Sequence, residues 1–175
     1  MPGMRGKGSL GQPLSRTRRV NAVCVDGNLC FTTGTNDGSG SETLPYARGT
    51  VAGRNFIVRM DSCCIGMDGV IDPSTADELE RLAGDCVIRQ PYFENLALAD
   101  NSNVTSEGRL RCRVSFTNPE NPSQKQSEWV DMVILKGTGP HPLLGWPASN
   151  RMGLRLMGDH ILVDKSTPPW KIPLL

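Results

Sequence analysis

The residue types in this sequence that could do chemistry gather in one short stretch. Asp61-Ser62-Cys63-Cys64 directly follows an apolar run, and Asp68 comes soon afterwards between two glycines. A carboxylate can act as a general acid or base, and a thiol can act as a nucleophile when a histidine activates it. By itself, an Asp-Ser pair after a strand is most often the start of a turn. The glycines near Asp68 indicate a loop tip for that residue.

The cysteines and histidines show no recognised catalytic or zinc-binding pattern. Six cysteines are scattered along the chain: Cys24, Cys30, Cys63, Cys64, Cys86 and Cys112. Neither of the two closest pairs has the spacing of zinc ligands, and we expect reduced thiols and no metal. The only histidines, His141 and His160, lie in proline-flanked or turn-like segments. A cysteine nucleophile would need one of them as its base.

The residues before Asp61 have the pattern of a β-hairpin. Apolar and polar residues alternate in Tyr46 to Val51 and in Arg54 to Met60, on either side of a turn at Ala52-Gly53. The second of these strands runs directly into Asp61. We therefore expect the Asp-Ser pair at the end of a strand, where the next turn begins.

The rest of the chain predicts one short helix and many short strands. Asp72 as N-cap, Pro73 in the first turn and Gly84 as a stop predict a helix between them. Strand-like stretches follow at residues 86–89, 96–99, 104–116, 128–135, 151–156 and 160–164. The 19 glycines and 13 prolines among 175 residues favour short strands and many turns. Because closing a small sheet removes its exposed edges, the sequence predicts an all-β fold, a small closed β-barrel with one short helix.

The order of these segments resembles the retropepsin family, the aspartic proteases of retroviruses and of long-terminal-repeat retrotransposons. The resemblance covers roughly Leu44 to Val163. Its main segments are Tyr46–Ser62, similar to the family's hairpin into Asp-Thr/Ser-Gly, and Val130–Leu135 with Leu143-Leu144-Gly145-Trp146, similar to its late strand and apolar-apolar-Gly turn. Leu96–Ser102 and Arg19–Val23 are similar to segments that are common in the retrotransposon branch.

The resemblance implies a specific chemistry at Asp61. Aspartic proteases use two close carboxylates that share one proton, one as base on a water and the other as acid. This chain has no second Asp-Thr/Ser-Gly, so the pair would form between the Asp61 residues of a two-fold homodimer. Ser62 would lock the two active-site turns together, and the turn Leu143-Leu144-Gly145 would pack beneath them. The resemblance implies no metal and no organic cofactor, because the carboxylates and a water suffice.

The resemblance also implies a flap over the substrate, and it leaves two functions open. The candidate flap comprises Leu98, Ala99, Asp100, Asn101, Ser102, Asn103 and Val104. Where the family has Gly-Ala, this chain has Cys63-Cys64. A glycine there allows a tight turn that a side chain would strain. One reading is an endopeptidase that cleaves an extended peptide or polyprotein, and the other is a catalytically impaired domain that acts as a dimerisation or interaction module.

Charge and composition suggest three segments. We expect a basic, Gly/Ser-rich and flexible leader over residues 1–43, a retropepsin-like domain over 44–165 and a C-terminal tail over 166–175. The net charge is only +1, but the first 20 residues hold five basic and no acidic side chains. This arm could make weak, non-specific contact with nucleic acid, and an RNA-binding fragment is a further alternative that predicts strongly salt-dependent binding. No apolar run is long enough for a membrane span or a signal peptide, so we expect an intracellular, cytoplasmic protein.

Overall fold

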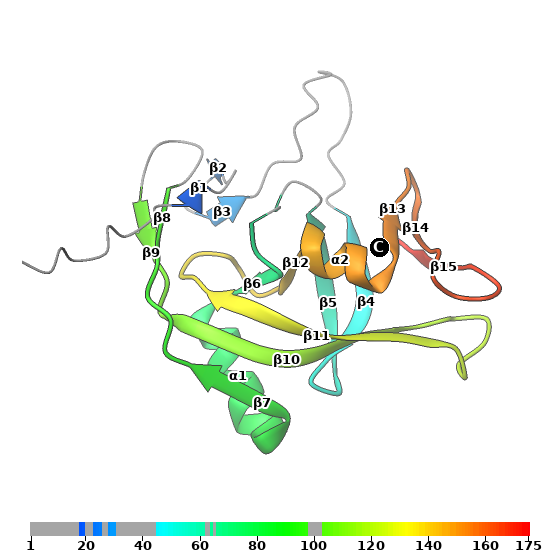
Figure 1. Cartoon of the computed structure of the whole chain (residues 1–175), viewed down its shortest axis with the longest axis horizontal. Helices are drawn as coiled ribbons and strands as arrows, with labels where there is room; N and C mark the ends of the chain where they lie inside the picture. Colours follow the sequence, from blue (N-terminus) through cyan, green and yellow to red (C-terminus); the bar gives the residue numbers. More distant parts are fainter. Residues whose placement is uncertain are drawn as a thin grey trace, which may run out of the picture.

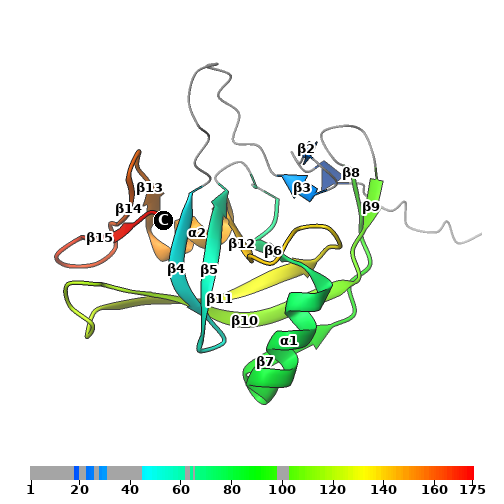
Figure 2. The same cartoon turned by 180° about the vertical axis from the view of Figure 1, so that it is seen from behind.

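The structure is a computed structural model that describes residues 18–19, 23–25, 28–30, 45–61, 64, 66–97 and 103–175. Most of the described chain is β-structure, with two short helices on the outside (Figures 1 and 2). Among the described residues, neither helix is long and apolar enough to cross a membrane.

The hairpin expected before Asp61 is present. Strands β4 (Tyr46–Val51) and β5 (Arg54–Asp61) pair antiparallel from Tyr46 opposite Arg59 to Val51 opposite Arg54. The turn residues Ala52 and Gly53 both have positive φ, 49° and 77°, as the tight turns of twisted hairpins require. Towards its end, from Val58 to Asp61, β5 is buried on both faces.

Six strands close into a small barrel, as the sequence predicts. Its other members are β6 (Gly69–Ile71), β10 (Gly108–Thr117), β11 (Lys125–Ile134) and β12 (Leu143–Gly145). The order is β11-β6-β12-β5-β4-β10, and the pairing of β10 with β11 closes the ring. Two of the contacts, β12 with β5 and β11 with β6, are parallel.

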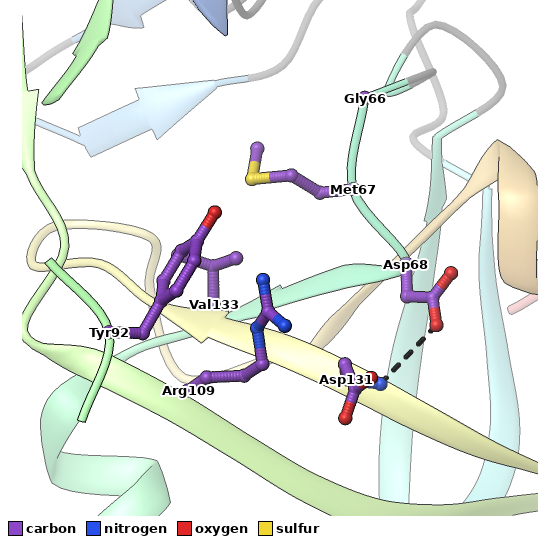
Figure 3. A pocket seen from close by; sticks show the side chains of 7 residues that line it. All are labelled: Gly66, Met67, Asp68, Tyr92, Arg109, Asp131 and Val133. Carbon is purple, nitrogen blue, oxygen red and sulfur yellow. Dashed lines mark hydrogen bonds between the residues drawn. The ribbon is translucent and has the colours of Figure 1, made fainter. Parts of the chain in front are cut away.

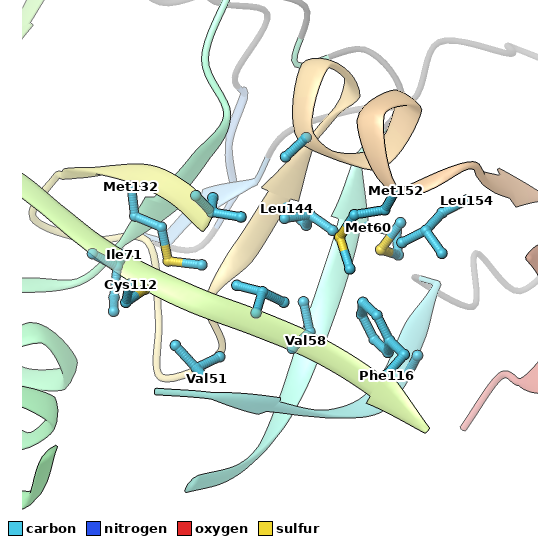
Figure 4. Close-up of a cluster of buried hydrophobic side chains, with 14 of the residues drawn as sticks. Val51, Val58, Met60, Ile71, Cys112, Phe116, Met132, Leu144, Met152 and Leu154 are labelled. Carbon is cyan, nitrogen blue, oxygen red and sulfur yellow. The ribbon is translucent and has the colours of Figure 1, made fainter. Parts of the chain in front are cut away.

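The barrel interior is filled by side chains from every strand of the ring. The largest buried ones include Phe116, Ile71, Met132 and Leu144 (Figure 4). Ile134 is buried in the same cluster. A second, smaller cluster lies beside it and includes Cys64, Met67, Val70, Leu96 and Leu143. This second cluster joins the loop after Asp61 to the strand that holds Leu96.

The expected helix forms with the caps that its sequence indicates. Helix α1 (Pro73–Ala83) begins after Asp72, whose carboxylate accepts hydrogen bonds from Ser74 N and Oγ at 3.0 and 2.7 Å. It ends at Gly84, and a 3-10 turn, η1 (Gly84–Cys86), leads into β7 (Val87–Gln90). Strand β7 pairs with the first half of β10, so that β10 has β7 and then β4 on the same edge.

The expectation of one helix and of a strand over residues 151–156 is wrong in part. Residues Trp146–Met152 form a second helix, α2, and only Leu154–Leu156 are a strand, β13. Pro147 lies in the first turn of α2, where its missing N–H costs nothing, and Gly153 ends the helix in the left-handed region with φ 67°. Both signals are in the sequence, but the helix is too short to show a clear 3.6-residue period.

The segment over 166–175, expected to be a tail, belongs to the folded unit. Strand β15 (Trp170–Pro173) pairs with β14 (His160–Val163), which also pairs with β13. Trp170 and Ile172 are buried because alternate residues of β15 face the core. This strand was not predicted from the sequence, because prolines precede Trp170 and proline is disfavoured inside strands.

Only parts of the leader and the flap are described. In the leader these are β1 (Arg18–Arg19), β2 (Val23–Val25) and β3 (Asn28–Cys30); β1 pairs with β8 (Asn95–Ala97), and β2 pairs with β3. Strand β8 also pairs antiparallel with β9 (Asn103–Thr105), and we call this pair the β8–β9 hairpin. Of the seven flap residues, Asn103 and Val104 lie in β9, and Leu98, Ala99, Asp100, Asn101 and Ser102 lie outside the described residues.

Candidate active site

Asp61 is the last residue of β5 and has only 3% of its surface exposed. Its backbone carbonyl accepts a hydrogen bond from Cys64 N at 3.3 Å, which marks a tight turn directly after the strand. Ser62 and Cys63, which the sequence analysis assigns to this turn, lie outside the described residues. The structure thus places a buried carboxyl group at the point where a strand ends and a loop begins.

The residues Leu143, Leu144 and Gly145 form the strand β12 beside Asp61, where the sequence analysis expected a turn. β12 runs parallel to β5, and Gly145 stands opposite Asp61. Two hydrogen bonds tie this strand end to the loop after Asp61, from Gly145 N to Asp68 O at 2.8 Å and from Trp146 N to Cys64 O at 2.9 Å. The three segments therefore form one hydrogen-bonded unit around the carboxyl group.

The close approach of β12 to the loop after Asp61 requires a glycine at position 145. A Cβ atom at Gly145 would lie 2.2 Å from Met67 O and 2.9 Å from Cys64 O, both backbone atoms. Real Cβ atoms do not come so close, so a side chain there would push the loop away from β12. The glycine of the apolar-apolar-Gly motif thus sets the distance between the strand and the loop after Asp61.

Cys64 fits inside the same unit. Its side chain is 3% exposed, and its thiol donates a long hydrogen bond to Met67 O at 3.8 Å. Cys112 is buried as well, whereas Cys86 is exposed. The two histidines are engaged elsewhere: His141 packs edge-on against Tyr46, and His160 Nδ1 lies 2.6 Å from Asp159.

A small, mostly apolar depression of about 20 Å³ lies next to Asp61. Its walls are formed by Met60, Trp146, Ser149, Leu154 and Leu156 together with Asp61. Trp146 is 43% exposed and Leu156 is 38% exposed, although both are large apolar side chains. The neighbouring Met157 is 45% exposed. The carboxyl group therefore lies beside a patch of exposed apolar surface, formed by Trp146 and Leu156.

Asp68 is part of the framework rather than a free loop tip. Its carboxylate accepts hydrogen bonds from both terminal nitrogens of Arg151 on α2, at 2.8 and 2.6 Å, and one from Asp131 N at 3.4 Å. The hydrogen bond to Asp68 raises the pKa of Arg151 above its ordinary value. The sequence analysis did not link Asp68 with Arg151, because 83 positions separate them.

The hairpin β8–β9 is anchored at its base by a buried serine. Ser106 is 1% exposed; its hydroxyl donates to Tyr92 O at 2.8 Å and accepts from Glu94 N at 2.8 Å. Ser106 N also donates to Glu94 O at 3.0 Å. The base of the hairpin is thus held firmly, next to the buried Leu96 that joins it to the loop after Asp61.

Among the described residues there is no group of three or more His, Cys, Asp or Glu side chains that could hold a metal ion. The arrangement around Asp61 offers a buried carboxyl group, a tight turn and an apolar surface. These are features suited to acid or base chemistry on a substrate that excludes water.

Comparisons with known proteins found similarity only among solved structures. No family model matches the sequence, and no curated protein matches it. Among solved structures, the chain is similar to the retroviral protease-like domain of Ddi1 from Leishmania major, with 11% identity, a TM-score of 0.48, and coverage of 79% of this chain and 95% of that one. It is also similar to EIAV protease complexed with the inhibitor HBY-793, with 14% identity, a TM-score of 0.42, and coverage of 68% and 97%. The barrel described above rests on this chain's own strand pairing.

Proposed function

We propose that this protein is an aspartic endopeptidase that works as a two-fold homodimer, with Asp61 of each copy forming the catalytic pair. The observation that carries the proposal is the buried carboxyl group of Asp61 at the end of β5, held between a tight turn and Gly145 of β12. The sequence resemblance to retropepsins centres on these same segments. Because one chain supplies one such carboxyl group, the second must come from another copy.

The chemistry needs only the two carboxyl groups and a water. Two carboxylates about 3 Å apart cannot both ionise, so the pair holds one proton between them. The ionised carboxylate takes a proton from the water as its oxygen attacks the peptide carbonyl, and the protonated one donates to that carbonyl oxygen. Collapse of the tetrahedral intermediate transfers a proton to the leaving nitrogen and breaks the C–N bond. An extended substrate would lie between the active turns and the β8–β9 hairpins and pair through its backbone.

The apolar surface beside Asp61 supports the dimer. Trp146 and Leu156 are exposed in the single chain and line the same depression as Asp61. Large exposed apolar side chains that gather in one place usually mark an interface. In the proposal, the second copy covers these side chains and brings its Asp61 to the first.

The proposal assigns catalysis to the domain over residues 44–165, extended by the strand β15. The substrate is a peptide or polyprotein segment, and a retrotransposon-type element is the kind of source that the sequence resemblance suggests. The basic leader over residues 1–43 contributes at most weak, non-specific contact with nucleic acid, which weakens as salt is raised.

Cleavage of quenched fluorescent octapeptides with apolar central residues, between pH 4 and 7, tests the proposal. The wild type should cleave, and Asp61→Asn should not, because the amide cannot share or donate the proton. Asp85→Asn is the matched control, since Asp85 is an exposed acid on η1, outside the segments that surround Asp61. A statine-type inhibitor, which mimics the tetrahedral intermediate, should block the wild type. Cleavage by Asp61→Asn at the wild-type rate would refute the proposal.

A second candidate is a retropepsin-like domain that dimerises but does not cleave. Cys63 favours it, because it stands where the family has a glycine whose freedom allows a tight turn. Cys64, in contrast, is accommodated, since its side chain is buried beside Gly145. The variant Cys63→Gly separates the two candidates: a sharp rise from no cleavage to cleavage indicates an impaired natural chain, and an unchanged rate indicates that Cys63 is compatible with catalysis.

A further inference from the structure

A second pocket lies between the loop after Asp61 and the base of the β8–β9 hairpin (Figure 3). Its volume is about 200 Å³, which is large enough for one long side chain. The side chains that line it are those of Met67, Asp68, Tyr92, Arg109, Asp131 and Val133. Its walls therefore come from the loop, from β10 and β11, and from the segment that leads into β8.

The pocket is at a defined distance from Asp61. Gly145 stands opposite Asp61 on the neighbouring strand, and Gly145 N donates to Asp68 O on the other side. Two successive steps of hydrogen-bonded neighbours span about 10 Å, which is the reach of about three residues of an extended peptide. A peptide whose central bond lies at Asp61 would thus bring a side chain three residues away to this pocket.

Two side chains of opposite charge in the pocket each have a buried polar atom without a hydrogen-bond partner among the described residues, Arg109 Nε and Asp131 Oδ1. The Asp68 carboxylate is neutralised by Arg151, at 2.8 and 2.6 Å. The Arg109 guanidinium stacks on the Tyr92 ring at 4.0 Å from its centre, and its Nε is buried without a hydrogen-bond partner among the described residues. Asp131 Oδ1 is likewise buried without such a partner there, although Arg111 of β10 stands opposite Asp131 in the strand pairing. Both residues are only partly exposed, so water satisfies them less well than at an open surface.

The two strands fix the relation between these groups. Arg109 on β10 stands opposite Val133 on β11, and Asp131 is two residues before Val133. Arg109 and Asp131 therefore point to the same face of the ribbon as diagonal neighbours. Figure 3 shows Arg109 and Asp131 among the residues that line the pocket, together with Met67 and Tyr92.

We infer that this pocket selects a substrate residue with a carboxamide side chain, glutamine or asparagine, about three residues from the cleaved bond. A carboxamide offers a carbonyl oxygen to the Arg109 guanidinium and an N–H group to the Asp131 carboxylate, and it adds no charge to a pair that is already balanced. A carboxylate would pair with Arg109 but would be repelled by Asp131, and an ammonium group would pair with Asp131 but would be repelled by Arg109. An apolar side chain would form no hydrogen bond with either residue. The inference rests on the proposed function for the position of the peptide, and in a two-fold dimer it applies on both sides of the bond.

Variants with one charge removed give the sharpest test. The probes are octapeptides with one apolar centre that differ only in the third residue from that centre, which is Gln, Glu, Lys or Leu. Binding is measured by fluorescence anisotropy to Asp61→Asn, and cleavage is measured separately with the wild type. We expect Gln to bind about tenfold more tightly than Leu, the effect of one hydrogen bond to a charged group. Arg109→Gln should shift the preference to Lys, and Asp131→Asn should shift it to Glu.

The controls are charge changes outside the pocket. Arg113→Gln removes an exposed arginine on the same strand, and Asp85→Asn removes an exposed acid from η1. Both should keep the preference for Gln.

Equal binding of all four peptides, no binding of any peptide by folded protein, or the same preference in both pocket variants would overturn the inference. If the peptide with Gln binds preferentially but the wild type does not cleave it, the pocket inference is supported and the endopeptidase proposal is refuted. If the wild type cleaves all four peptides without preference, the endopeptidase proposal is supported and the pocket inference is refuted.

Discussion

Gly145 lies where β12 passes between the end of β5 and the loop that follows Asp61. Because a Cβ atom there would meet Met67 O at 2.2 Å, Gly145→Ala must move the loop or the strand. We expect the free energy of unfolding to fall by about 1 to 3 kcal/mol, the typical range for overpacking in a close-packed site. Chemical denaturation of the purified protein measures this value.

The matched control is Gly158→Ala, because a Cβ atom at Gly158 would have nothing within 4 Å. This change should alter the stability by no more than about 0.5 kcal/mol. Similar losses for both glycines would show that the close approach at Gly145 has no energetic consequence.

Because of Cys112, the stability of the protein should decrease as the pH rises in the alkaline range. Burial, and to a lesser degree the Asp131 charge, raises the pKa of the Cys112 thiol from 9.0 to about 12. Since the folded state favours the neutral thiol, its contribution is complete below pH 9 and is lost as the pH rises towards 12. In that window each pH unit costs about 1.4 kcal/mol for a fully shifted group.

Urea unfolding at pH 7 and pH 10.5 of the wild type and of Cys112→Val isolates this contribution from other titrating groups. The wild type should lose more stability than the variant between the two values. An equal loss in both proteins would mean that Cys112 ionises as easily in the folded chain as in the unfolded one.

Single residues of the site were predictable only where their neighbours in sequence reveal their role. Asp61 and Gly145 stand out because each ends an apolar run at a turn signal. The pair of Asp68 and Arg151 was missed, as were Arg109 and Asp131, because these groups meet through the fold over long separations in the chain. No periodicity or local motif carries such a pairing.

At the level of elements, the ion pair of Arg151 and Asp68 links α2 to the loop after Asp61. Arg151→Ala should lower stability by about 1 kcal/mol, since the pair is bidentate but its arginine is 42% exposed. Arg151→Lys should recover only part of this loss, because an ammonium group cannot make the two parallel hydrogen bonds. Thermal denaturation at low and high salt measures the difference, which salt should reduce.

Arg155→Ala provides the comparison, because the Arg155 side chain pairs with Asp164 at a more exposed site, where it is 67% exposed. Its loss should be close to zero. If both variants lose the same stability, the geometry of the Arg151 pair contributes nothing beyond that of a surface ion pair.

Elements with strong local signals were predicted correctly, and elements without them were not. The β4–β5 hairpin is visible in its alternation and its Ala52-Gly53 turn, and α1 is visible in its cap at Asp72. Helix α2 has only seven residues, and β15 follows two prolines, so neither shows a clear period. Both are stabilised by packing against the barrel core, through Met152 and Trp170, which a sequence pattern does not display.

At the level of the whole molecule, the barrel was predictable because a small chain with many short strands has few other ways to remove its sheet edges. The strand order was not predicted, since the parallel contacts of β12 with β5 and of β11 with β6 join segments far apart in the chain. The homodimer remains a proposal, and it depends on the apolar surface that is exposed in the single chain.

Dimer formation predicts that activity depends on protein concentration and on the apolar patch beside Asp61. Leu156→Glu puts a charge on that patch, which a second copy would have to bury, so the variant should be a folded monomer without peptidase activity. Ile88→Glu is the control: Ile88 is 49% exposed, but it lies on β7, away from α2 and β13 (Figure 1). Sedimentation equilibrium gives the association state, and the specific activity over a dilution series should fall as the wild type dissociates. A monomeric wild type with constant specific activity would exclude a shared pair of Asp61 residues, because one chain supplies only one such carboxyl group.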